Sequence, residues 1–254
     1  MKNKSYISTV IANWKMHNDF NAALDLVIKI FSYSNMAKNV EKIICPPAVN
    51  IIPLYDQFKN STFSLGAQNI NENNEGTYTG EISVNMLKNY ITHAIIGHSE
   101  RREIFNESNY TISLKAKALL SNKIVPVICV GEPLEIYKKN RSVEFINNQL
   151  FEILSKIQTN SEILIAYEPI WSIGNKNPAD PVYVEKIITK SKDFLSTIRP
   201  IRNVNHKFLY GGSVNSKNVL DYTKQQNIDG VLVGSASLDA SEFGKIVLQI
   251  SNNG

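Results

Sequence analysis

Eight short apolar runs, spread along the whole chain, are the feature that most constrains its fold. Each run is apolar at both odd and even positions, which is typical of a strand that is covered on both faces in a parallel sheet. The predicted strands are 6–13, 42–45, 63–67, 93–97, 124–130, 163–167, 207–211 and 230–234. Such a sheet needs helices on its faces.

The segments between these runs carry the 3.6-residue period of amphipathic helices. Three apolar helix faces are predicted, made of Phe20, Ala23, Leu24, Val27, Ile28 and Phe31; of Ile146, Leu150, Ile153, Leu154 and Ile157; and of Phe243, Ile246, Val247 and Ile250. Asp180-Pro181 predicts the start of another helix, because aspartate caps N-termini and proline suits the first helical position.

Strands that alternate with helices over 254 residues predict an α/β protein with a closed (β/α)₈ barrel and one domain, residues 1–254. A doubly wound open sheet is the alternative. It usually carries a GxGxxG turn after the first strand, and none follows Ile11-Ala12-Asn13 here. No linker, low-complexity segment or block of charge divides the chain.

The charge balance of 27 basic and 23 acidic residues gives a net charge of +4, and the basic residues are dispersed. This balance suits an anionic small molecule and lacks the concentrated basic patch of a nucleic-acid binder. Polar residues from Asn13 to His17 interrupt the N-terminal segment too early for a signal peptide, and no run approaches the roughly 18 apolar residues of a membrane span. We therefore expect a cytoplasmic protein with Cys45 and Cys129 as buried, reduced thiols.

Polar residues directly follow five of the predicted strands, and the active site of a (β/α)₈ barrel lies at the carboxyl ends of its strands. These groups are Asn13-Trp14-Lys15, residues 97–102 (GHSERR), Glu168-Pro169, residues 211–213 (GGS) and residues 234–235 (GS). Glu168 is the most informative. A carboxylate at the end of a buried strand is partly removed from water, which makes it a better base.

Each of the other groups also has a purely structural interpretation. Lys15 on its own is typical of a solvated charge, and a lone His98 is more often a structural histidine. Glu100, Arg101 and Arg102 together resemble a surface ion-pair cluster. Glycine pairs after strands are often simple turns.

The ends of the last two strands favour a phosphate site. GGSV at 211–214 and GVLVGSASL at 230–238 place small residues at both ends, where exposed backbone N–H groups bind anions. In (β/α)₈ barrels, phosphate sites often follow strands seven and eight. A base, an imidazole, a cation and a phosphate site together predict proton transfer on a phosphorylated carbonyl compound.

Seven motifs, in order from the first strand to the last, resemble those of the triosephosphate isomerase family. They are NWKMH (13–17), GAQN (66–69), GTYTGEIS (76–83), GHSERR (97–102), AYEPIWSIG (166–174), YGGSV (210–214) and DGVLVGSASL (229–238). The resemblance thus covers essentially the whole chain.

This resemblance implies the interconversion of dihydroxyacetone phosphate and glyceraldehyde 3-phosphate, without cofactor or metal, by a homodimer. It implies that Glu168 moves the proton between two carbons and that a neutral His98 polarises the carbonyl. A helix N-terminus after His98 would disfavour a positive charge on its ring. Lys15 would stabilise the enediolate and the phosphate, and Asn13 would bind the substrate oxygens.

The resemblance further implies a carboxylate beside Lys15, at Glu100, and a loop that reaches the other subunit. In this loop, Thr77 would approach the partner's Asn13 and the partner's Glu100. The phosphate would be held by the backbone N–H groups of Gly174, Ser213, Gly234 and Ser235.

The chain departs from the family pattern at two places. The lid after AYEPIWSIG usually has a Thr-Gly pair and here reads Asn175-Lys176-Asn177-Pro178, so we expect altered rates of closure with Ile173 closing against Leu232. Ser235 stands where the family usually has glycine, and phosphate binding needs only its N–H if serine can adopt its φ.

Two other functions remain as alternatives to the isomerase. One is a phosphate-binding barrel that catalyses a different reaction, and the co-occurrence of the NWK, GHSE and AYEP motifs argues against it. The other is an inactive barrel that acts as a scaffold, and the presence of Asn13, Lys15, His98 and Glu168 argues against that.

Overall fold

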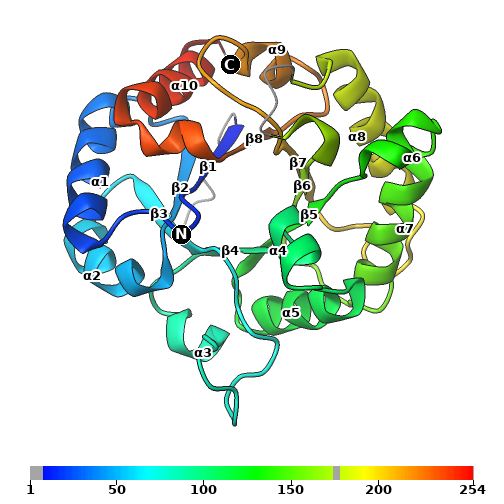
Figure 1. Ribbon diagram of the computed structural model, residues 1–254, viewed down its shortest axis with the longest axis horizontal. Coiled ribbons are helices and arrows are strands. Elements are labelled where there is room, and N and C mark those ends of the chain that lie inside the picture. Colours follow the sequence, from blue (N-terminus) through cyan, green and yellow to red (C-terminus); the bar gives the residue numbers. More distant parts are fainter. Residues whose placement is uncertain (1–7, 174–177, 254) are drawn as a thin grey trace.

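Eight parallel strands close into one barrel in the computed structural model, which describes residues 8–173 and 178–253. Each strand pairs with the next along the chain, and β1 pairs with β8 (Figure 1). The strands are β1 (Ser8–Asn13), β2 (Val40–Cys45), β3 (Phe63–Ala67), β4 (His93–Ile96), β5 (Val125–Val130), β6 (Ile163–Tyr167), β7 (His206–Tyr210) and β8 (Gly230–Val233). The predicted (β/α)₈ barrel is confirmed.

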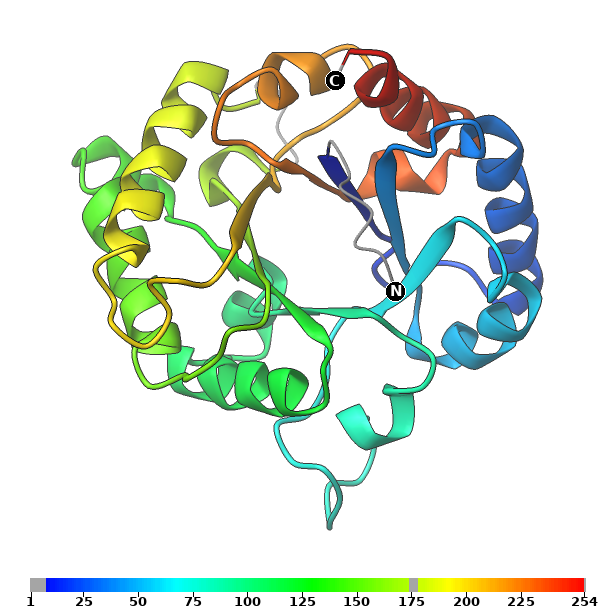
Figure 2. The same ribbon diagram turned by 180° about the vertical axis from the view of Figure 1, so that it is seen from behind.

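The helices form an outer ring that surrounds the barrel in both views (Figures 1 and 2). They are α1 (Phe20–Ser34), α2 (Ala48–Phe58), α3 (Val84–Leu87), α4 (Ser99–Ile104), α5 (Asn109–Ser121), α6 (Leu134–Lys138), α7 (Ser142–Leu154), α8 (Pro181–Leu195), α9 (Val219–Thr223) and α10 (Ala240–Asn253), with 3₁₀ turns η1 (Ile170–Ser172) and η2 (Ser235–Leu238). The segment between β3 and α3 projects away from the ring (Figures 1 and 2).

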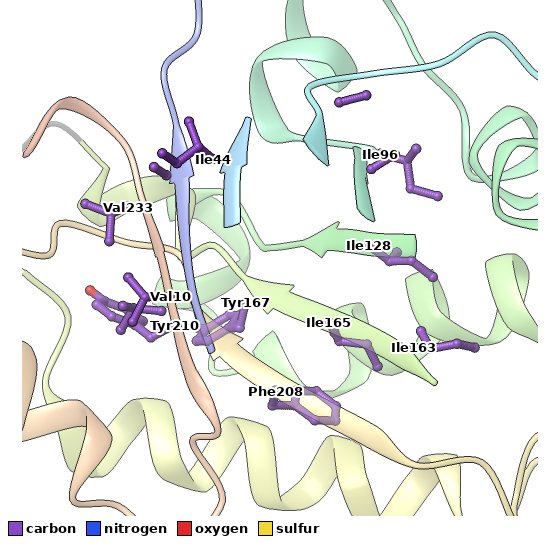
Figure 3. Close-up of a cluster of buried hydrophobic side chains, with 14 of the residues drawn as sticks. Val10, Ile44, Ile96, Ile128, Ile163, Ile165, Tyr167, Phe208, Tyr210 and Val233 are labelled. Carbon is purple, nitrogen blue, oxygen red and sulfur yellow. The ribbon is translucent and has the colours of Figure 1, made fainter. Parts of the chain in front are cut away.

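The strands are buried on both faces, as predicted. Their inward side chains form an apolar cluster inside the barrel, and their outward side chains join the larger core beneath the helices. In β1, for example, Ile11 belongs to the inner cluster while Val10 and Ala12 belong to the outer core. Figure 3 shows side chains of this outer core on several strands, among them Ile128 on β5, Ile165 on β6 and Phe208 on β7.

The closure between β1 and β8 requires a glycine. A Cβ atom on Gly230 would lie 1.9 Å from the backbone oxygen of Thr9, which is far inside van der Waals contact. The two strands pair there in register, with Thr9 opposite Gly230. The absent side chain therefore lets the last strand approach the first.

Two of the three predicted helix faces are confirmed, and that of α1 is wrong in part. The predicted face residues within α7 and α10 are all buried, and Ile157, which was predicted to belong to the first of these faces, is buried but follows the end of α7. In α1 the buried residues are Ala23, Leu26, Val27, Ile30 and Ser34, whereas Phe20 and Ile28 are 38% and 53% exposed. Asn21, Asp25 and Lys29 lie on the exposed side of α1, and the apolar residues extend beyond the side opposite them. Packing against α10 and α2 decides which of these apolar residues are buried.

Other local predictions are also confirmed. Asp180 caps α8 by accepting a hydrogen bond from Tyr183 N, with Pro181 as the first helical residue. Cys45 and Cys129 are free and buried. Among the described residues, no helix is long and apolar enough to span a membrane.

Candidate active site

The carboxyl ends of the strands open into a cavity of about 640 Å³. Its walls include seven residues that the sequence placed in the site, namely Asn13, Lys15, His98, Glu168, Ser213, Gly234 and Ser235. Ile173 and Leu232, the predicted contact pair of the lid, also line it. Gly174 and lid residues 175–177 lie outside the described residues, and Pro178 is exposed.

Glu168 directly follows β6 and is only 2% exposed. Its Oε2 accepts a hydrogen bond from Ser99 N at 3.0 Å. Its Oε1 lies 3.2 Å from His98 Nε2 but has no hydrogen-bond partner among the described residues. A Cβ atom on Gly211 would lie 2.9 Å from Glu168 Cγ, so the glycine leaves room for this side chain. The carboxylate is thus held through one oxygen, and the other is available to accept a proton.

His98 follows β4 and is the N-cap of α4. Its Nδ1 accepts a hydrogen bond from Glu100 N at 3.3 Å. An acceptor nitrogen carries no proton, so the neutral ring has its proton on Nε2, on the side of Glu168. A helix N-terminus does follow His98, as the predicted neutral ring requires. The ring therefore presents a donor beside the carboxylate.

Lys15 has a left-handed backbone conformation, with φ of 52°. Its N–H donates to Asn13 Oδ1 at 3.1 Å, and its carbonyl accepts from Gln68 Nε2 at 2.8 Å. The Lys15 ammonium forms an ion pair with Glu100 Oε1. Glu100 therefore lies beside Lys15, as the family resemblance implied.

The charged cluster after β4 is more than a surface ion-pair group, so that structural interpretation is wrong. Glu100 pairs with Lys15, whereas Arg101 pairs with Glu107 at 2.5 Å. Arg102 donates from Nε to Gly97 O at 2.7 Å and from Nη2 to Cys129 O at 2.9 Å. Burial lowers the pKa of Arg102, and nearby groups including Glu168 oppose this effect. Arg102 thereby ties the end of β4, next to His98, to the end of β5.

Cys129 lies close to Glu168. Burial raises the pKa of its thiol well above the ordinary value, and the negative charge of Glu168 raises it further. The thiol therefore stays protonated and neutral, and adds no negative charge beside Glu168.

Loops after β7 and β8 form the part of the cavity predicted to bind phosphate. Ser213 is fixed by two contacts, since its Oγ donates to Ser172 O at 3.1 Å and its carbonyl accepts from Asn218 Nδ2 at 3.0 Å. Gly234 O accepts from both Ser237 N and Ser237 Oγ, at 2.9 and 2.6 Å. Lys15 Cε lies 3.8 Å from where a Cβ of Gly234 would be, so this cation reaches the same loop.

A second network beside the site was not predicted. Glu132 is fully buried, and its Oε1 accepts hydrogen bonds from Tyr167 OH at 3.0 Å, Trp171 Nε1 at 2.9 Å and Tyr183 OH at 3.2 Å. It joins the loop after β5 to β6, to η1 and to α8. No sequence pattern pairs these residues, because their partners are 35 to 51 positions away.

Taken together, the cavity is lined by a buried carboxylate, an imidazole, an ammonium group and two turns of small residues. This set can move a proton between carbon atoms next to a carbonyl group while it holds an anionic substituent. Among the described residues, no group of three or more His, Cys, Asp or Glu side chains could hold a metal ion.

Known proteins resemble this chain along nearly its whole length. The family model described as triosephosphate isomerase matches residues 8–250. The triosephosphate isomerase of Dehalococcoides mccartyi is 39% identical over 241 residues, covering 94% of this chain and 95% of that protein. That of Mycoplasma capricolum is 39% identical over 239 residues, covering 92% and 95%. The crystal structure of the Bartonella henselae enzyme has a TM-score of 0.85 at 31% identity, covering 96% of this chain and 99% of that one.

Proposed function

The chain belongs to the triosephosphate isomerase family and interconverts dihydroxyacetone phosphate and glyceraldehyde 3-phosphate, and we propose that Glu168, His98 and Lys15 carry out this reaction. The observation that carries the assignment is the 3.2 Å approach of His98 Nε2 to Glu168 Oε1 in the wall of the cavity. The reaction belongs to glycolysis, and the enzyme is an isomerase that requires no cofactor.

Glu168 acts as the base. Its carboxylate removes a proton from the carbon next to the substrate carbonyl, which leaves an enediolate, and returns the proton to the adjacent carbon. Two features support this role: the carboxylate is almost fully buried, and Oε1 makes no hydrogen bond within the described residues. Positioned general bases commonly accelerate such steps by 10²- to 10⁴-fold.

His98 donates from Nε2 to the carbonyl oxygen and then moves protons between the two substrate oxygens. Its hydrogen bond from Glu100 N supports the tautomer that this requires. When the neutral ring gives its Nε2 proton to one oxygen it becomes an imidazolate, and this imidazolate takes a proton back from the other oxygen, so the ring ends the reaction unchanged.

Lys15 and Asn13 stabilise the negative charge that develops on the substrate. The ammonium group is worth most when the substrate excludes water from the cavity. Glu100 orients this ammonium through the ion pair. Asn13 Oδ1 already accepts from Lys15 N, so Asn13 binds the substrate oxygens through its side-chain N–H groups.

The backbone N–H groups of Ser213, Gly234 and Ser235 hold the phosphate, together with that of Gly174, which lies outside the described residues. The cavity wall and the nearby Lys15 support this placement.

The enzyme is a homodimer in which the segment around Thr77 enters the partner subunit. Residues 74–81 are exposed at the projecting segment (Figure 1). A second cavity of about 380 Å³, lined by Asn13, Lys15 and Glu100, opens beside the first. Its rim carries Met16 and Phe105, which are 94% and 62% exposed. A partner loop in this cavity would cover both side chains.

We also propose that residues 1–254 act as one catalytic domain, in the cytoplasm, where glycolysis takes place.

A coupled assay with glyceraldehyde 3-phosphate tests the function. The purified protein is expected to turn over the substrate without added metal or cofactor, and inorganic phosphate is expected to inhibit competitively. A folded dimer without turnover would contradict the proposal and favour the scaffold alternative.

A further inference from the structure

Ser235 differs from the neighbouring serines of the cavity in that it is exposed and its hydroxyl group makes no hydrogen bond within the described residues. It is the first residue of η2, directly after Gly234, and it is an exposed part of the cavity wall. Its φ is not positive, so a serine fits this backbone without strain. The sequence pattern of the family usually has glycine here, which supplies a backbone N–H and nothing more.

The hydroxyl group of Ser235 is available, in contrast to those of the nearby serines. Ser213 Oγ donates to Ser172 O at 3.1 Å, and Ser237 Oγ donates to Gly234 O at 2.6 Å. Within residues 8–173 and 178–253, Ser235 Oγ has no such bond to a protein group. A serine hydroxyl rotates freely to meet an acceptor, and a phosphate oxygen is a strong acceptor.

The surroundings of Ser235 favour an anion. Lys15 Cε lies 3.8 Å from where a Cβ on Gly234 would be, which brings its ammonium group to the same turn. The turn itself is held by the two hydrogen bonds that Gly234 O accepts from Ser237. An anion bound here would thus meet a fixed backbone, a cation and an unengaged hydroxyl.

We propose that the Ser235 side chain determines phosphate affinity, by donating a hydrogen bond from Oγ to the substrate phosphate beside the one from its own N–H. The inference rests on the proposed function, because it assumes that the phosphate lies at this turn. It follows that this enzyme holds phosphorylated trioses, and free inorganic phosphate, more tightly than it would with glycine at 235.

The test compares Ser235→Ala, which removes the hydroxyl, with Ser235→Thr, which keeps it. Three quantities are measured: KM for glyceraldehyde 3-phosphate, the inhibition constant of inorganic phosphate, and the rate of proton exchange in unphosphorylated glyceraldehyde followed by NMR in D₂O. In the alanine variant, KM and the inhibition constant are expected to rise about threefold to tenfold, as for the loss of one hydrogen bond. Exchange in glyceraldehyde, which has no phosphate, is expected to stay within about twofold of the parent, and the threonine variant is expected to match the parent.

Unchanged KM and inhibition constant in Ser235→Ala would overturn the inference. Equal losses with the phosphorylated and unphosphorylated substrates would also overturn it, since they would indicate a structural role, as would equal losses in the alanine and threonine variants. Failure of the parent protein to isomerise glyceraldehyde 3-phosphate would instead refute the proposed function. Titration of the parent with inorganic phosphate shows separately whether the cavity binds phosphate, so a failure of the function is distinguished from a failure of the role of Ser235.

Discussion

Lys15 keeps a left-handed backbone conformation, which costs a residue with a side chain about 1–2 kcal/mol. Two hydrogen bonds hold Lys15 in this conformation. Lys15 N donates to Asn13 Oδ1, and Gln68 Nε2 donates to Lys15 O. Gln68 Nε2 also donates to Cys45 O at 2.9 Å, so one amide joins the loop after β1 to the end of β2. The strained backbone directs the Lys15 ammonium group toward the cavity. Gln68, which lies outside the loop, holds this backbone in place through its hydrogen bond to Lys15 O.

Gln68→Met should therefore misplace Lys15 while preserving the shape of the side chain. We expect kcat/KM to fall about tenfold or more, because a displacement of about 1 Å costs up to 10²-fold in rate. We expect the free energy of unfolding to fall by about 0.5–1.5 kcal/mol, since the partly buried Lys15 O and Cys45 O each lose a donor. Gln225→Met is the control, because Gln225 Nε2 donates to a single exposed carbonyl, that of Asp221. Parent-like kinetics in Gln68→Met would contradict this role.

The sequence predicted which residues meet in the cavity better than it predicted what holds them. Asn13, Lys15, His98 and Glu168 each lie at the carboxyl end of a strand or within two residues after it, and the barrel brings these ends together. Gln68 belongs to a motif that the sequence displayed, but its partners lie 23 and 53 positions away. Such pairs depend on the register of neighbouring strands, which periodicity does not contain.

At the level of elements, the strands were predictable because each is apolar on both faces. The face of α1 was predicted only in part, because its apolar residues extend beyond the side that packing buries, and Phe20 and Ile28 lie on the exposed part. The network around Glu132 has the same character. Its donors come from β6, η1 and α8, and the hydroxyl of Tyr183 extends it to Ser142 Oγ on α7, at 2.7 Å.

Tyr183→Phe tests how much the hydrogen bonds around Glu132 contribute to the free energy of unfolding. A carboxylate is an acceptor only, so Tyr183 donates to Glu132 and accepts from Ser142. The free energy of unfolding, measured by urea denaturation, should fall by about 1–3 kcal/mol, because a buried carboxylate loses a donor. Tyr110→Phe removes a hydroxyl from a residue that is 71% exposed and should stay within about 0.5 kcal/mol of the parent. Equal values for both variants would contradict a structural role of the network.

For the whole molecule, pH dependence of stability is expected from His93. This residue is buried in β4, and burial lowers its pKa from 6.5 to about 4. Above pH 6.5 both folded and unfolded states are neutral at His93. As the pH falls from 6.5 to 4, the unfolded chain gains a proton that the folded chain does not, so stability is lost in this window.

His93→Phe should remove that loss. Between pH 7.5 and 5, the parent is expected to lose about 2 kcal/mol more unfolding free energy than the variant, at 1.36 kcal/mol per pKa unit. His17→Gln is the control, because His17 is exposed at the mouth of the cavity and should leave the parent profile unchanged. Parallel profiles for the parent and His93→Phe would contradict the prediction.

Assembly is the other property of the whole molecule. If the segment around Thr77 completes the partner's site, Thr77→Arg should shift the protein toward monomers in sedimentation velocity and lower the specific activity on dilution. Thr197→Arg is the control, because Thr197 is exposed just after α8. This substitution should change neither the sedimentation behaviour nor the activity on dilution. A fully active monomer would contradict the proposed dependence on the dimer.

The central claim is that Glu168 is the base, and Glu168→Gln tests it most directly. Glutamine keeps the size of the side chain and its contact with Ser99 N but accepts no proton from carbon. With the fold confirmed by circular dichroism, kcat for glyceraldehyde 3-phosphate is expected to fall by about 10²- to 10⁴-fold, as for the loss of a general base. A turnover within a few-fold of the parent would show that another group removes the proton.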